Sequence, residues 1–84
     1  MKLNDFALPE VIGSAPRIVM KGREEALIEK HRGLLSYDLS CVRVRCAAGE
    51  VRIDGSNLSI PYFGSEDMIV AGKIDRVCFE GEEA

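Results

Sequence analysis

His31 is the only histidine of the chain, and it lies in a charged stretch with Glu29, Lys30 and Arg32. A histidine near a carboxylate can act as a general acid or base, so this stretch is the first candidate for catalysis. The sequence has none of the patterns that usually accompany such chemistry, such as a GxSxG nucleophile turn, an HExxH helix or a glycine-rich phosphate loop. We therefore interpret His31 as a solvated turn residue, and we expect a protein that is not an enzyme and uses no cofactor.

Three cysteines, Cys41, Cys46 and Cys78, are the candidates for metal binding or disulfide formation. Cys41 and Cys46 are farther apart than the paired ligands of a zinc knuckle, so we expect no metal site. An odd number of cysteines fits a reducing compartment, and we expect a cytoplasmic protein. On one regular strand Cys41 and Cys46 face opposite sides, and we interpret Cys46 and Cys78 as small buried apolar residues.

Three arginines, Arg43, Arg45 and Arg52, are predicted to share the outer face of one hairpin. Glu50 and Asp54 lie on the same strands and can neutralise them, which would make this an ordinary solvated face. The alternative is a binding surface for an acidic partner protein or for anionic lipid headgroups, with peripheral contact to a membrane. We expect no nucleic-acid binding, because no aromatic residues alternate with these arginines and the chain is acidic.

The length and composition are typical of one small soluble domain. The chain has 84 residues, 46% of them hydrophobic and 30% charged, with a formal net charge of −3. It contains no apolar run of the length of a membrane span, and its first residues lack the apolar stretch of a signal peptide. Because a domain of this size has a small core, we expect help from a partner or from a second copy of the chain.

The clearest secondary-structure signal is a hairpin formed by residues 42–46 and 51–54. Both segments alternate strictly between apolar and polar residues, and Gly49 lies between them. One register pairs Val44 with Ile53 and Arg45 with Arg52, whereas the other pairs Val44 with Val51 and Arg43 with Arg52. Both registers place the valines on one face and the arginines on the other.

Other short apolar runs predict further strands at 18–20, 26–29 and 34–37. After the central hairpin we expect a second turn at 54–57, which would place Ile53 opposite Leu58. Pro61 is then predicted to end the strand, because proline cannot donate to a strand ladder, and residues 62–67 to form a loop.

In the last segment the apolar residues occupy even positions as far as Ile74 and odd positions from Val77 onward. This switch requires a turn or a bulge near Asp75 and Arg76, since otherwise the apolar side chains would change sides of the sheet.

Together these patterns predict an all-β fold, an antiparallel meander of about seven or eight short strands that forms a small sandwich or open roll. We expect residues 1–16 to form an arm with a short helix, 17–79 the single β domain and 80–84 an acidic tail. The free rim of such a sheet can be covered by the arm or by a strand from a second chain, and the sequence leaves both open.

The order and spacing of several segments resemble one known family. The segments are Leu8-Pro9-Glu10-Val11-Ile12, Pro16-Arg17-Ile18, Ile28 to Tyr37, Gly49 to Ile60 and Gly72 to Phe79. They resemble the YabP/YqfC family of small sporulation proteins of endospore-forming bacteria, and the YqfC-like branch in particular. The chain departs from the family at Cys46-Ala47-Ala48, where members often have Thr or Ser and a larger apolar residue.

The resemblance implies a non-enzymatic role in assembling the cortex or coat of the endospore, inside the developing cell. It also implies a partnership with membrane-bound sporulation proteins. His31, Arg32 and Gly33 match the most recognisable polar motif of the family, and with Arg43, Arg45 and Arg52 they are our candidate interaction residues. Gly33 could adopt a positive φ in the turn while His31 and Arg32 face outward or brace a neighbouring loop.

Overall fold

The computed structural model describes residues 15–47 and 49–81. The predicted helical arm lies largely before this part of the chain, and the end of the predicted acidic tail lies beyond it. The described residues contain no helix of the length and apolarity that a membrane crossing requires.

The described residues form one antiparallel sheet, which confirms the all-β prediction. Its strands follow the spatial order β1-β2-β6-β5-β4-β3. They are β1 (Arg17–Lys21), β2 (Glu25–Glu29), β3 (Leu34–Asp38), β4 (Cys41–Cys46), β5 (Gly49–Phe63) and β6 (Asp67–Gly81). The sheet therefore has six strands in this part of the chain, fewer than the seven or eight that the sequence pattern predicted.

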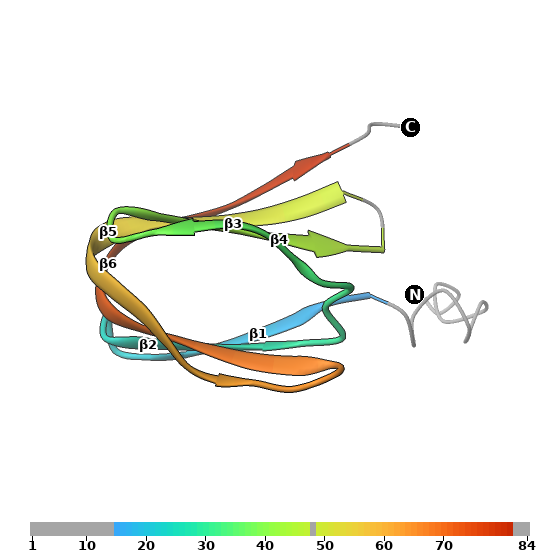
Figure 1. The fold of residues 1–84 in the computed structure, drawn as a ribbon, viewed down its shortest axis with the longest axis horizontal. Helices are drawn as coiled ribbons and strands as arrows, with labels where there is room; N and C mark the ends of the chain where they lie inside the picture. The colour runs from blue at the N-terminus through green and yellow to red at the C-terminus, as the bar shows by residue number, and fades with distance from the viewer. Residues whose placement is uncertain (1–14, 48, 82–84) are drawn as a thin grey trace, which may run out of the picture.

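The difference in strand number arises because β5 and β6 are each 15 residues long. Figure 1 shows both strands bending at one end of the molecule, so that each contributes one half to an upper layer and one half to a lower layer. The upper layer adds β3 and β4, and the lower layer adds β1 and β2. The single sheet is thus folded over itself as an open roll.

The predicted turn at 54–57 is wrong, because the chain bends there without reversing. The register with β6 is irregular between Asp54 and Ser59, and Asn57 has a φ of 53°. These local irregularities are enough to redirect a strand while it keeps its partner. Pro61 does not end β5 either. Among the strands that the structure describes, this half of β5 pairs with β6 alone, and proline is tolerated on an edge strand.

The hairpin turns on either side hold this bend. The backbone N–H groups of Gly72 and Ile74 in β6 donate to carbonyls in the turn between β1 and β2, at 3.1 and 2.8 Å. Those of Gly55 and Leu58 in β5 donate to carbonyls in the turn between β3 and β4, at 3.0 and 2.9 Å. The bend therefore keeps its backbone hydrogen bonds although the ladder is irregular.

The predicted parity switch in the last segment is confirmed. Asp54 pairs with Arg76 while Gly55 pairs with Ile74, which leaves Asp75 as an extra residue in β6. This bulge lets Ile74 and Val77 both face the core.

The predicted meander, in which successive strands are neighbours, is wrong at one connection. β2 lies beside β6 and not beside β3, so residues 30–33 carry the chain from the lower layer to the upper layer at the open end of the roll (Figure 1). Within the central hairpin, Val44 pairs with Val51 and Arg43 with Arg52, which is the second of the two expected registers.

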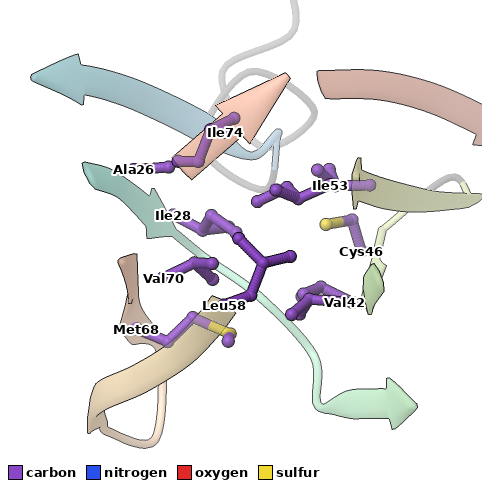
Figure 2. Close-up of a cluster of buried hydrophobic side chains, with 11 residues drawn as sticks. Ala26, Ile28, Val42, Cys46, Ile53, Leu58, Met68, Val70 and Ile74 are labelled. Atoms are coloured by element: carbon purple, nitrogen blue, oxygen red, sulfur yellow. The ribbon is translucent and has the colours of Figure 1, made fainter. Parts of the chain in front are cut away.

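The core lies between the two layers, and 11 of the described residues are buried in it (Figure 2). Leu58 lies at its centre, between side chains from the upper layer, such as Val42, and from the lower layer, such as Ile28. The buried residues are Ala26, Ile28, Val42, Val44, Cys46, Val51, Ile53, Leu58, Met68, Val70 and Ile74.

Candidate functional site

His31 is buried at the open end of the roll, with 5% of its surface exposed. Its ring stacks on Phe63, with 5.1 Å between the ring centroids, and its Nε2 lies 2.9 Å from the carbonyl oxygen of Gly64. The interpretation as a solvated turn residue is therefore wrong. The side chain braces the turn between β5 and β6, which was the second role expected for this motif.

Only one tautomer of the imidazole makes both hydrogen bonds of the ring nitrogens. The backbone N–H of Gly33 donates to Nδ1 at 3.0 Å, so Nδ1 is unprotonated. Nε2 then carries the hydrogen and donates it to the Gly64 carbonyl. Both ring nitrogens of His31 are thus occupied by backbone groups of this corner.

The rest of the motif connects this corner to the upper layer. The N–H of Arg32 donates to the carbonyl of Arg45, and the N–H of Arg45 donates to the carbonyl of Gly33, both at 2.8 Å. Gly33 has a φ of 125°, so the expected positive φ is confirmed. Residues 30–33 and 63–66 together line a hollow of about 590 Å³.

The strand that follows this corner, β3, is exposed along its whole length. It lies at the edge of the sheet, where β4 is its only partner among the described strands, and Leu35 forms a bulge between residues paired with β4. Leu34, Leu35 and Tyr37 are 39%, 38% and 45% exposed. Sequence reasoning identified this strand but missed its exposure, although the run Leu34-Leu35 already breaks the alternation expected of a half-buried strand.

The far end of β3 is fixed by side-chain hydrogen bonds. The Tyr37 hydroxyl donates to the carbonyl of Leu58 at 2.9 Å. A carboxylate oxygen of Asp38 accepts from the N–H groups of Ser40 and Cys41, and these bonds, led by Ser40, lower the pKa of Asp38. Both ends of β3 are therefore anchored, while its outer side is free among the described residues.

The predicted arginine face is present on the outer side of the upper layer, and much of its charge is compensated there. Arg43 forms a two-pronged ion pair with Glu50, at 2.8 and 2.9 Å. Hydrogen bonding to Arg43 lowers the pKa of Glu50, and the carboxylate in turn raises the pKa of Arg43.

Asp54 compensates a second pair of arginines, Arg52 at 3.1 Å and Arg76 at 3.3 Å. Burial alone would raise the pKa of Asp54, but its hydrogen bond and charge interaction with Arg52, together with the bond from Arg76, outweigh this and lower it. Sequence reasoning missed Arg76, because its place beside Asp54 depends on the pairing of β5 with β6.

Arg45 and Arg32 differ from these paired arginines. Both are exposed, and neither has a carboxylate within 4.0 Å in the part of the chain that the structure describes. Their backbones are hydrogen-bonded to each other, so both lie at the end of β3 nearest His31. The six candidate residues thus fall into two groups, one at this corner and one, Arg43 and Arg52, in the compensated network.

The cysteines are free thiols. Cys46 is buried, as expected, and burial raises its pKa, whereas Cys78 is only half-buried. Cys41 faces the other side of β4, and its pKa is also raised, mainly by burial. Within residues 15–47 and 49–81, no three His, Cys, Asp or Glu side chains gather in a way that could hold a metal ion.

Comparison with known proteins relates the chain to one family. The sequence model of the YabP family matches residues 13–84. An uncharacterized protein of Bacillus subtilis (strain 168), YqfC, is 39% identical over 69 residues, which cover 82% of this chain and 74% of that protein. No solved structure matches the chain.

Proposed function

The chain belongs to the YabP family, and we propose that it is a small sporulation protein that acts by binding another protein and not by catalysis. The proposed setting is assembly of the endospore cortex or coat, in the cytoplasm of the developing cell. The proposed partner is a sporulation protein associated with a membrane. The link to sporulation rests on family membership, and the binding role rests on the exposed edge strand β3.

The observation that carries the binding role is that β3 exposes both backbone groups and apolar side chains to an incoming peptide strand. Its outer backbone groups have no strand neighbour among the described residues, so an incoming strand can add to the sheet. The exposed side chains of Leu34 and Leu35 supply apolar contacts beside that backbone. Strand addition gives affinity through main-chain hydrogen bonds, and the flanking side chains give specificity.

The charges beside β3 indicate what kind of segment the proposed partner presents. Arg32 and Arg45 lie at one end of β3 without carboxylate partners in the described part of the chain, so acidic residues on the incoming segment can pair with them. Binding to anionic lipid headgroups has less support, because Arg43, Arg52 and Arg76 are already paired with carboxylates of this chain.

The test is genetic complementation with a variant whose β3 edge is blocked. Deletion of the gene in an endospore-forming host should stop spore maturation and leave vegetative growth normal. Leu35→Lys places a charge on the bulge of β3, which opposes strand addition, and should fail to restore heat-resistant spores. The protein level should stay unchanged, because Leu35 is already partly exposed.

Val19→Lys is the matched control, since Val19 lies on the opposite edge strand β1 and is 40% exposed. It should restore spores to the wild-type count. Full sporulation of the deletion strain would contradict the sporulation role, and full complementation by Leu35→Lys would contradict the role of β3.

A further inference from the structure

The fold leaves a second open edge in the upper layer, along the last half of β6. Beyond Ile74, β6 is bonded to β5 on one side only, and no other described strand lies on its outer side (Figure 1). From Arg76 to Gly81 its pairing with β5 runs without irregularity, opposite residues Asp54 to Gly49. A regular open edge of this kind is a template for another strand.

The lower layer also has a regular edge, at β1, among the described residues, but a second copy paired there would place Arg17 opposite Lys21, two like charges. Its rim at β5 carries Pro61, which cannot donate a backbone hydrogen bond. The open half of β6 instead exposes an apolar side chain, Phe79, which is 67% exposed although it points to the core side of the sheet.

The sequence of this half-strand is complementary to itself. Residues directly opposite each other in an antiparallel pair face the same side, so a second copy that continues the same sheet can be centred on Val77, Cys78 or Phe79. Of these, the register centred on Cys78 places Arg76 opposite Glu80 of the other copy, and Glu80 opposite its Arg76. The same register places Val77 opposite Phe79, so that apolar side chains meet on the core side.

We propose that two copies of this chain pair through the last halves of their β6 strands, antiparallel and with Cys78 on the two-fold axis. The pairing joins the two upper layers into one continuous sheet and covers Phe79. It also places each exposed Arg76, which shares Asp54 of its own chain with Arg52, beside Glu80 of the other copy. It leaves β3 of each copy open, so the dimer and the partner proposed above use opposite edges of one layer.

Cysteine cross-linking tests the register. In an antiparallel pair, opposed Cα atoms are about 4.5–5.5 Å apart, a separation that a disulfide spans. The Cys41→Ser variant, oxidised with copper phenanthroline and oxygen, should form a covalent dimer through Cys78. The Cys78→Ser variant, which keeps Cys41 and Cys46, is the control and should stay monomeric on a denaturing gel. An equal cross-link in the control, or none in Cys41→Ser, would overturn the proposed register.

Charge exchange tests the proposal without oxidation. Glu80→Arg places two like-charged pairs across the axis and should weaken dimerisation about tenfold or more, as measured by sedimentation equilibrium. In the chain itself Glu80 is a surface residue whose ion pair with Arg52 is long, at 4.0 Å, and it lies opposite Glu50, so Glu80→Arg should leave the fold intact. The double variant Arg76→Glu with Glu80→Arg should restore dimerisation.

A wild-type protein that stays monomeric at high concentration, or a dimer that Glu80→Arg does not weaken, would overturn the proposal. Loss of the dimer would leave the test of β3 unaffected.

Discussion

His31 lies where the chain crosses from the lower layer to the upper layer, and its contacts fix the chain there. Its ring nitrogens bond to Gly33 and Gly64, and its ring covers Phe63. These contacts fix the start of β3, the strand that we propose binds the partner. The segment His31-Arg32-Gly33 therefore positions the strand through His31, while the side chain of Arg32 is exposed and has no carboxylate partner among the described residues.

Replacing His31 with alanine should lower the free energy of unfolding by about 2–3 kcal/mol. The substitution leaves the Gly33 N–H and the Gly64 carbonyl without their partner and removes the stacking on Phe63. Urea unfolding followed by circular dichroism measures the loss. Arg32→Ala, at the neighbouring exposed position, is the control and should change stability by less than about 0.5 kcal/mol. Equal stability of the two variants would show that the histidine does not brace this corner.

The burial of His31 could not be predicted from the sequence around it. Its charged neighbours are typical of a solvated turn, and the groups that bury it come from the turn between β5 and β6, with Gly64 lying 33 residues later in the chain. The arginine face was more predictable, because strict alternation along β4 and β5 decides which side each residue faces. The pairing of Arg76 with Asp54 was not, since it depends on a register between distant strands.

At the scale of strands, the sequence predicts regular strands well, but it predicts bends within a strand poorly. Alternation identified the central hairpin, and the parity switch located the Asp75 bulge. Residues 54–57, Asp-Gly-Ser-Asn, suit a reversal and a bend equally, so their composition alone could not distinguish the two. The distinction is made by β6, which stays paired with β5 on both sides of the bend and keeps the chain from turning back.

The bend depends on glycine at position 72, where β6 passes β5 closely. Gly72 has a φ of 133°, and a Cβ atom there would lie 2.6 Å from the carbonyl oxygen of Asn57. Gly72→Ala should therefore cost about 3 kcal/mol or more in the free energy of unfolding, from backbone strain and from the steric clash. Thermal and urea unfolding measure it.

Gly22→Ala is the control for backbone strain alone. Gly22 also has a positive φ, of 59°, but a Cβ atom there would meet no heavy atom within 4 Å. Its cost should be about 1 kcal/mol. If both variants lost the same stability, close packing at the bend would not be what requires Gly72.

At the scale of the whole molecule, folding one sheet over itself buries a core and, among residues 15–47 and 49–81, leaves two open edges in the upper layer. The apolar residues of both layers meet around Leu58, while β3 and the last half of β6 remain available for other strands (Figures 1 and 2). A small core and open edges fit a protein that becomes part of a larger assembly. The two proposals assign one edge to a sporulation partner and the other to a second copy of the chain.

Site-specific photo-crosslinking in sporulating cells tests the role of β3 most directly. A photoreactive amino acid at position 35, on β3, should give a covalent adduct with one other sporulation protein, and the same probe at position 19, on β1, should not. That protein, once purified, should bind the wild-type chain and should bind Leu35→Lys much more weakly. An adduct formed from position 19 and not from position 35, or equal binding of Leu35→Lys, would contradict the account.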